Sequence, residues 1–184
     1  MLTNIDEHLF NFFFNLAAGS PLIGNIMAII TIWSSRVFAV IYLFAVVLML
    51  AKNNKKVLPI IAAPAVTVFA VQIIRFFYLR PRPFVALEID NLIYHTASGS
   101  MPSMHAASAF VIAAVIWCVH KKAGNILLLF AFVTGLSRVM VGVHFPADVL
   151  LGSILGLSFG FAAFKIVDKL GWYKKYSWEY HSGE

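Results

Sequence analysis

The sequence predicts an all-α fold, a polytopic bundle of about six transmembrane helices. Its 184 residues are 61% hydrophobic with a mean hydropathy of +0.85, and 12% are charged, whereas about a quarter of the residues of a soluble domain are charged. Apolar runs also recur at lengths close to the roughly 20 residues that span a bilayer as a helix. So much apolar surface requires lipid as its solvent, and we expect residues 1–184 to form one integral membrane domain.

Residues 1–34 are expected to form a broken or interfacial helix ahead of the core. An apolar run covers residues 9–16, a Gly-Ser-Pro sequence ending at Pro21 interrupts it, and a second run covers residues 22–33. The pattern fits one broken span, or an interfacial helix followed by a short one. The next connection is expected near residues 33–36.

Residues 35–168 are expected to form the helical core. Its predicted spans are the apolar runs 37–51, 57–79, 104–119, 125–141 and 147–166. The polar tail, residues 169–184, is rich in Trp, Tyr and Lys and is expected to lie on the cytoplasmic side.

The lysines predict the orientation of these spans. All nine lie between the second and third spans, between the fourth and fifth spans, or at the end of the last span and beyond it. They are Lys52, Lys55, Lys56, Lys121, Lys122, Lys165, Lys169, Lys174 and Lys175. Basic residues favour the cytoplasmic side, so the chain is predicted to be a multi-pass protein of the inner or plasma membrane. The net charge of +6 is therefore interpreted as membrane topology, and no nucleic-acid partner is expected.

The arginines gather near the predicted outer ends of the spans. Arg75 ends the third span, and Arg82 follows in an extended loop beside Pro83. Guanidinium groups match phosphate oxygens bidentately, so Arg75 and Arg82 are predicted phosphate ligands with Pro83 in support. Arg80 is expected to be a solvated loop charge.

A second group stands where the outer loop enters the span 104–119. Pro102 marks the boundary, and Ser103 is a plausible N-cap. A helix N-terminus offers free backbone N–H groups to an anion, so Ser103 is a predicted phosphate ligand. His105, in the first turn, is close enough to donate a proton.

The third group surrounds the last outer connection. Ser137 and Arg138 end the fifth span, His144 lies in the short loop, and Asp148 follows one helical turn later. Asp148 is taken to be the only acid of the apolar body, where an unpaired carboxylate would be costly. We expect it to accept a proton from one nitrogen of His144, which leaves the other nitrogen as a nucleophile.

Together these groups favour an anionic substrate held by three arginines. A magnesium site would need several acids, so neither a metal nor another cofactor is expected.

These residues resemble the type 2 phosphatidic acid phosphatase superfamily, which has a basic residue ahead of Arg-Pro, then Pro-Ser-Gly-His, then Ser-Arg with His and Asp following. The matches are Arg75, Arg82 and Pro83; Pro102, Ser103 and His105; and Ser137, Arg138, His144 and Asp148. Arg75 stands where the family usually has lysine, and Met104 replaces its glycine.

The resemblance implies a lipid phosphatase that needs no cofactor. His144 would attack phosphorus and form a phosphohistidine, with Asp148 holding its ring. His105 would protonate the leaving oxygen and then help to activate water. Arg75, Arg82, Arg138 and Ser103 would hold the phosphate oxygens.

Residues 82–85 and 92–98 look like the bacitracin-resistance type of undecaprenyl-diphosphate phosphatase, which would make undecaprenyl diphosphate the substrate. A lipid A 1-phosphatase and a phosphatidylglycerophosphate phosphatase are alternatives within the family. Two alternatives of another class are a non-catalytic lipid-phosphate binder or transporter on the same scaffold and a haloperoxidase, an activity that also occurs in this superfamily.

Overall fold

The computed structural model describes residues 2–170, and these residues form α-helices and no strand. This confirms the all-α prediction. The predicted tail lies outside the described residues from residue 171 onward. The helices are α1 (Leu2–Ala18), α2 (Pro21–Ala51), α3 (Val57–Phe77), α4 (Pro83–Ala86), α5 (Met104–Val119), α6 (Lys121–Met140) and α7 (Pro146–Lys169).

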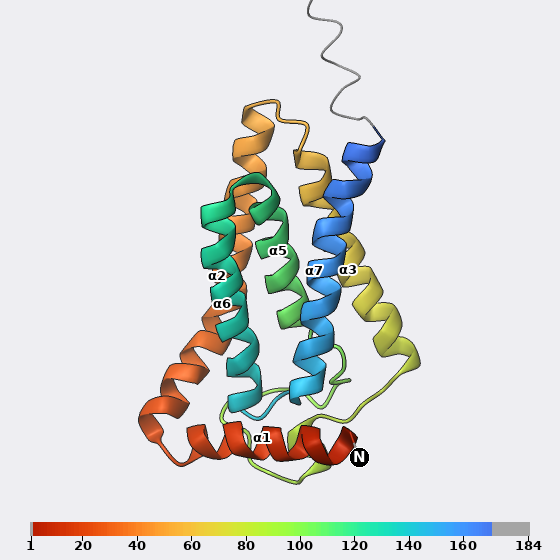
Figure 1. Cartoon of the computed structure of the whole chain (residues 1–184). Helices are drawn as coiled ribbons and strands as arrows, with labels where there is room; N and C mark the ends of the chain where they lie inside the picture. The colour runs from red at the N-terminus through yellow and green to blue at the C-terminus, as the bar shows by residue number, and fades with distance from the viewer. Residues whose placement is uncertain (1, 171–184) are drawn as a thin grey trace, which may run out of the picture.

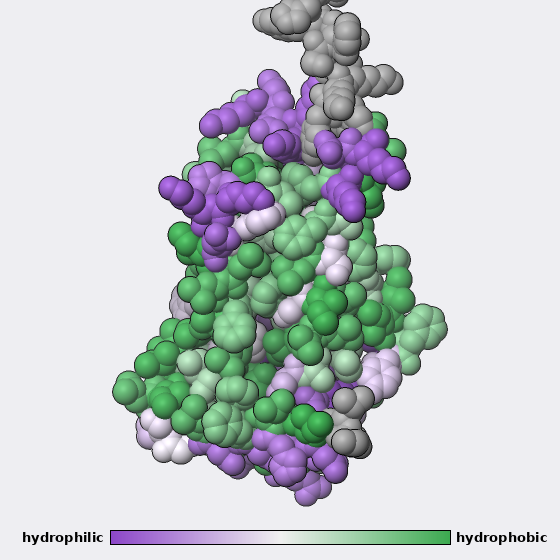
Figure 2. Space-filling view, in the orientation of Figure 1, coloured by the Kyte–Doolittle hydropathy of each residue, from purple (hydrophilic) through white to green (hydrophobic). Residues whose placement is uncertain are grey.

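Helices α2, α3, α6 and α7 surround α5, and α1 lies across one end of this bundle (Figure 1). Most of α5 is buried between Ala106 and Ile116. The surrounding helices expose large apolar side chains such as Phe44, Phe69 and Phe132. Figure 2 shows the result, a hydrophobic band between hydrophilic ends, which is the surface expected of a protein in a bilayer.

Four helices are long and apolar enough to cross a membrane: α2, α3, α6 and α7. The fifth, α5, is apolar but has 16 residues. The count of about six spans stays a prediction, because α1 lies across the bundle (Figure 1).

The expected connection near residues 33–36 is wrong, because both apolar runs 22–33 and 37–51 belong to the single helix α2. Ser34 is buried against the bundle, and the guanidinium of Arg36 lies 4.9 Å from the centroid of the Trp33 ring. These polar residues interrupt the hydropathy pattern without interrupting the helix. With 31 residues, α2 is about 46 Å long at 1.5 Å per residue.

The other expected break, before Pro21, is present between α1 and α2. Helix α1 presents one face to the bundle, formed by Asp6, Phe10, Phe14 and Ala17. Phe10 stacks on Phe14 with ring centroids 5.5 Å apart and meets Phe145 at 5.3 Å. These contacts hold α1 against the start of α7.

Helices α5 and α7 pack closely through glycines at every fourth position of α7. A Cβ atom on Gly152 would lie 2.5 Å from the carbonyl oxygen of Ser103, and one on Gly156 would lie 2.5 Å from that of Ala107. A Cβ atom on Gly160 would lie 2.6 Å from the Cβ of Ala114. Small residues in this pattern let helix backbones approach closely. The first turns of α5 and α7 are thereby brought side by side, and Ser103 N donates to Asp148 O at 2.9 Å.

We expect Gly156→Leu to destabilise the protein by at least about 1–3 kcal/mol, because the new side chain overpacks the α5–α7 contact. Thermal unfolding of the purified protein in detergent measures this effect. The matched control is Ser158→Leu, which adds similar bulk at an exposed position of the same helix. Equal melting temperatures for the two variants would contradict the assigned packing.

The described lysines lie at one end of the bundle, at the α2–α3 and α5–α6 connections and near the C-terminal end of α7. Helix α1 lies across the opposite end (Figures 1 and 2). Lys174 and Lys175 are outside the described residues.

Candidate active site

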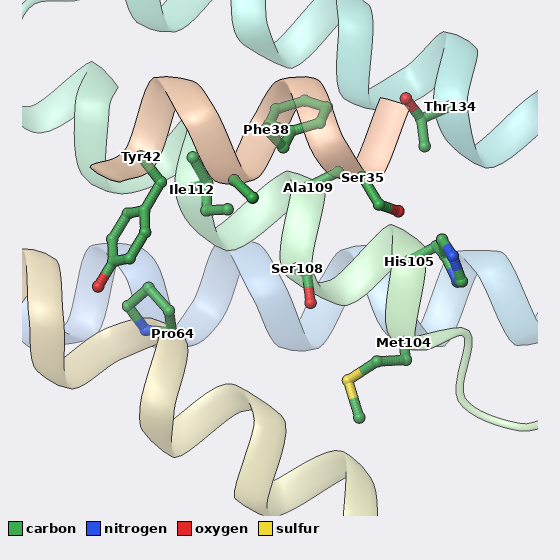
Figure 3. Close-up of a pocket in the computed structure, with 11 residues that line it drawn as sticks. Ser35, Phe38, Tyr42, Pro64, Met104, His105, Ser108, Ala109, Ile112 and Thr134 are labelled. Carbon is green, nitrogen blue, oxygen red and sulfur yellow. The ribbon is translucent and has the colours of Figure 1, made fainter. Parts of the chain in front are cut away.

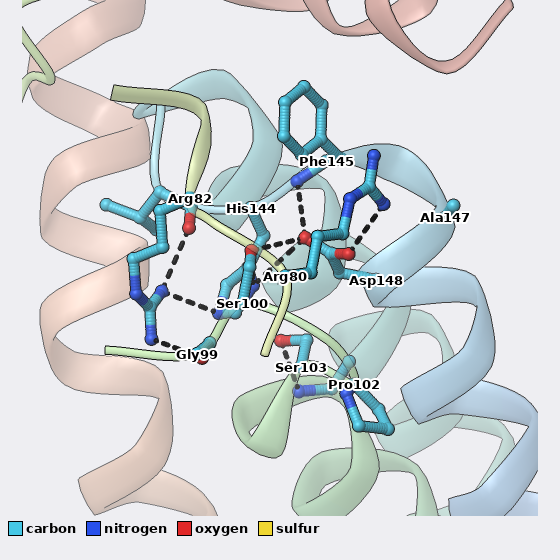
Figure 4. Close-up of polar contacts among 12 residues, drawn as sticks. Arg80, Arg82, Gly99, Ser100, Pro102, Ser103, His144, Phe145, Ala147 and Asp148 are labelled. Carbon is cyan, nitrogen blue, oxygen red and sulfur yellow. Dashed lines mark hydrogen bonds and ion pairs between the residues drawn. The ribbon is translucent and has the colours of Figure 1, made fainter. Parts of the chain in front are cut away.

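The three predicted groups converge at the end of the bundle that α1 covers. The loop between α3 and α5, the loop between α6 and α7 and the first turn of α7 contribute the side chains in Figure 4. The last turn of α6 adds Ser137 and Arg138, and the first turn of α5 adds His105. All the predicted site residues except Arg75 and His105 are buried: Arg82, Pro83, Pro102, Ser103, Ser137, Arg138, His144 and Asp148. Distant parts of the sequence therefore build one enclosed polar site.

His144 is held in one tautomer by its neighbours. Its Nε2 atom lies 3.2 Å from Nη1 of Arg82. A guanidinium can only donate, so Nε2 accepts and carries no proton, and the proton of the neutral ring is on Nδ1. Burial, together with the positive charges of Arg138 and Arg82, lowers the pKa of His144 to about 3, although Asp148 acts in the opposite direction. The ring is therefore neutral at physiological pH.

Ser100, which the sequence analysis did not single out, bridges His144 and Asp148. Its Oγ lies 3.3 Å from Nδ1 of His144 and donates to Oδ2 of Asp148 at 2.5 Å. The direct distance from Nδ1 to Oδ2 is 3.6 Å, longer than a hydrogen bond. The expected His144–Asp148 pair is thus close, but its hydrogen-bonded connection runs through Ser100. The only hint in the sequence is the position of Ser100 just before the Pro-Ser motif.

Asp148 is fully buried and its two carboxylate oxygens have different partners. Oδ2 accepts from Ser100 and, at 2.9 Å, from the backbone N–H of Phe145, which caps the start of α7. Oδ1 accepts from Nη1 of Arg80 at 2.8 Å. These bonds fix the orientation of the carboxylate beside His144.

The expectation that Arg80 is a solvated loop charge is wrong. Its side chain is 14% exposed, and it bridges Asp148 and Asp6. Although burial opposes its charge, these two carboxylates raise the pKa of Arg80. Asp6 is itself buried, so Asp148 is not the only acid of the apolar body. Asp6 comes from α1, far away in sequence, and local patterns around Arg80 could not reveal it.

The two other arginines of the first group, Arg75 and Arg82, donate hydrogen bonds to backbone carbonyls. Arg75 donates from Nε and Nη2 to the carbonyl of Pro102, at 3.0 and 2.7 Å. Arg82 donates to the carbonyls of Ser98 and Val143, at 3.0 and 2.9 Å. Burial and the neighbouring charge of Arg75 lower the pKa of Arg82 to about 10, so Arg82 stays charged at neutral pH.

Arg138 differs from them, because its Nε and Nη2 atoms have no hydrogen-bond partner among the described residues. The residue is only 2% exposed. A buried charged donor without a partner carries a full desolvation cost. Arg138 is therefore a buried arginine with two unsatisfied donor atoms to offer to an anion.

Ser103 is the N-cap of α5, as predicted, and its Oγ accepts from the N–H of Ala106 at 3.4 Å. Ser137 instead connects helices, because its Oγ lies 2.8 Å from Oγ1 of Thr31 on α2 and donates to the carbonyl of Thr134. Pro83 is the buried first residue of α4. The Pro102 carbonyl accepts the bonds from Arg75 described above.

His105 lies in the first turn of α5 and borders an apolar cavity of about 390 Å³ between α2, α3, α5 and α6 (Figure 3). Tyr42 and Pro64 also line this cavity, further along α2 and α3. The remaining lining residues are Ser35, Phe38, Ala39, Met104, Ser108, Ala109, Ile112 and Thr134. Of the predicted site residues, His105 is the one that lines this cavity.

Comparisons with known proteins agree on one family. The family model described as PAP2 superfamily matches residues 56–172. The chain is 31% identical over 166 residues to undecaprenyl-diphosphatase BcrC of Bacillus subtilis, covering 90% of this chain and 86% of the relative. It is 30% identical to a lipid A 4'-phosphatase of Bacteroides thetaiotaomicron, covering 92% and 80%. The crystal structure of Aquifex aeolicus LpxE superposes with a TM-score of 0.73 at 30% identity, covering 86% and 93%.

Proposed function

The chain belongs to the PAP2 superfamily and is a multi-pass membrane lipid phosphatase, and from this premise we propose that it hydrolyses undecaprenyl diphosphate to undecaprenyl phosphate and inorganic phosphate. The name of the BcrC relative supports this lipid. The observation that carries the phosphate chemistry is Arg138, a buried arginine whose Nε and Nη2 atoms lack partners among the described residues.

His144 is the proposed nucleophile. Its unprotonated Nε2 attacks the terminal phosphorus while the bond from that phosphorus to the bridging oxygen breaks. The proton on Nδ1 is held through Ser100 toward Asp148, which stabilises the ring as it gains positive charge. Water then attacks the phosphohistidine, phosphate leaves, and Nε2 is free again.

His105 is the proposed proton donor to the bridging oxygen as the lipid phosphate leaves, and it takes up its proton when the anionic diphosphate binds beside it. It then takes a proton from the attacking water, so that protons balance over the two steps. Its position in the first turn of α5, beside the cavity and two residues after the N-cap Ser103, supports this role.

The oxygens of the transferred phosphoryl group are held in this proposal by Arg138, Arg82 and Arg75, with Ser103 at the N-terminus of α5. Phosphoryl transfer depends mainly on positioning and electrostatic stabilisation. Arg138 donates to the phosphate oxygens from its Nε and Nη2 atoms. Arg75 and Arg82 keep their hydrogen bonds to backbone carbonyls and contribute positive charge.

The long lipid chain is proposed to lie along the cavity that His105 borders. Its lining is mainly apolar and runs from His105 toward Tyr42 (Figure 3), which suits an isoprenoid chain better than a soluble phosphate ester. A lipid A phosphatase and a phosphatidylglycerophosphate phosphatase remain the alternatives, and the matched lipid A 4'-phosphatase keeps the first of these open.

The site is proposed to face the periplasm or the outside of the cell. The described lysines lie at the end of the bundle opposite to α1, and the positive-inside rule assigns that end to the cytoplasm.

Phosphate release by the purified enzyme tests the proposed substrate. We expect the highest kcat/KM for undecaprenyl diphosphate among four lipids, the others being lipid A, phosphatidylglycerophosphate and phosphatidic acid. Activity should survive EDTA, and vanadate should inhibit, because it mimics the trigonal-bipyramidal phosphoryl group. A preference for another lipid would overturn the substrate assignment, and a strict magnesium requirement would overturn the mechanism.

Replacing Ser100 by alanine is expected to lower kcat by about 10- to 100-fold, because Nδ1 of His144 loses its hydrogen-bonded link to Asp148. KM should change little, since Ser100 is not proposed to touch the lipid. Ser100→Thr keeps the hydroxyl and should recover most of the rate. A Ser100→Ala enzyme with wild-type kcat would show that Asp148 acts on His144 without the bridge.

A further inference from the structure

Asp6, on the helix that lies across the end of the bundle, holds two parts of the active site at once. Its Oδ1 accepts from the backbone N–H of Ala147, in the first turn of α7, at 2.8 Å. Its Oδ2 accepts from Nη2 of Arg80 at 2.6 Å. The side chain is 10% exposed, so water competes little for these bonds.

Arg80 connects Asp6 to Asp148. Its Nη1 donates to Oδ1 of Asp148, and its guanidinium lies 4.2 Å from the centroid of the Phe145 ring (Figure 4). The same Phe145 ring packs against Phe10 of α1. The guanidinium is therefore fixed by two carboxylates and one aromatic face, all in or beside the active site.

This bridge determines which oxygen of Asp148 serves the nucleophile. Arg80 occupies Oδ1, so Oδ2 remains for Ser100 and, at 3.6 Å, for His144. Without Arg80, the buried carboxylates of Asp6 and Asp148 would both lie at the start of α7 with no cation between them. Like charges at short range repel each other strongly in a low-dielectric environment.

We infer that Arg80 and Asp6 are positioning residues, a clamp through which the N-terminal helix α1 orients Asp148 for the reaction of His144. Neither residue touches the lipid phosphate in this assignment, and both act through Asp148. The inference rests on the proposed phosphatase mechanism, and it adds α1 to the elements that build the active site.

Steady-state kinetics of the full-length enzyme in detergent test this clamp, with whichever lipid of the panel above the wild type hydrolyses. We expect Arg80→Met to lower kcat about 100-fold and Asp6→Asn about 10-fold, each with KM within about twofold of wild type. Arg80→Lys keeps a cation between the carboxylates and should return kcat to within about 10-fold of wild type. The matched control is Glu7→Gln, which removes the neighbouring acid of α1 and should leave kcat unchanged.

The double variant of Asp6→Asn and Arg80→Met separates the clamp from independent effects. Because Asp6 acts through Arg80, the double variant should be no slower than Arg80→Met alone. If the loss of kcat in the double variant equals the product of the losses in the two single variants, the clamp is overturned. It is also overturned if Asp6→Asn lowers the melting temperature but keeps the wild-type kcat. If Arg80→Met does not fold, Asp6→Asn decides alone.

The outcomes also separate this inference from the proposed function. A wild-type enzyme that releases phosphate from none of the lipids refutes both. An active wild type whose kcat is unchanged by Asp6→Asn refutes the clamp alone.

Discussion

The variant His144→Ala is expected to release phosphate at least about 10⁴-fold more slowly than the wild-type enzyme, because it lacks the proposed nucleophile. The Nε2 atom faces Arg82, Nδ1 is held by Ser100, and burial lowers the pKa of His144 to about 3. No other described histidine has this combination of a fixed tautomer and full burial. The residual rate would come from the arginines and the proton donor.

Two measurements check this expectation. Phosphate release by purified protein gives the rate, and quenching the wild type in alkaline detergent during turnover should trap an acid-labile, base-stable phosphate on the protein that is absent from His144→Ala. The control is His8→Ala, an exposed histidine on α1, which should keep wild-type activity. Full activity in His144→Ala would contradict the assignment of His144 as the nucleophile.

The variant Arg138→Met is expected to lose about 10³-fold in kcat/KM, within the range found for arginines that stabilise a transferring phosphoryl group. Its side chain is 2% exposed with Nε and Nη2 unpartnered among the described residues. A buried guanidinium with unpaired donors destabilises the protein in the absence of an anion. Arg138→Met should therefore be more stable than the wild type when no phosphate is bound, although it is nearly inactive.

Melting temperatures with and without vanadate measure both sides of this expectation. Vanadate should raise the melting temperature of the wild type, because a ligand that binds only the folded state stabilises it, and it should have little effect on Arg138→Met. Arg36→Met serves as the control, since Arg36 is exposed beside Trp33 on α2. A less stable Arg138→Met that still responds to vanadate would show that Arg138 has a structural role only.

These two experiments address different steps. His144 forms the covalent bond, so its loss should leave the binding of inorganic phosphate, which needs only the groups that hold the oxygens, largely in place. Arg138 binds the oxygens, so its loss should weaken vanadate binding and turnover together. If Arg138→Met loses turnover but still binds vanadate, the assignment of Arg138 to the phosphate oxygens is wrong.

Much of the fold followed from composition and hydropathy. The expected runs 57–79, 104–119, 125–141 and 147–166 correspond closely to α3, α5, α6 and α7, because apolar runs of this length have one stable form in lipid, a helix that satisfies its own backbone. The break inside 22–51 was wrong, since Ser34 and Arg36 lower local hydropathy and yet a helix accommodates both.

The amino-acid sequence was enough to predict the all-helical membrane fold, the lysine-rich end, and three groups of candidate site residues around Arg82, Ser103 and His144. Local patterns suffice for these predictions, because a helix start, an interfacial charge and an i, i+4 pair each involve residues close together in the chain. The contact of Ser100 with His144 and Asp148, and that of Arg80 with Asp6, could be found only in the folded structure. Those contacts join residues 44, 48 and 74 positions apart, and buried charges take their partners from whatever the packing of α1, α5 and α7 places beside them.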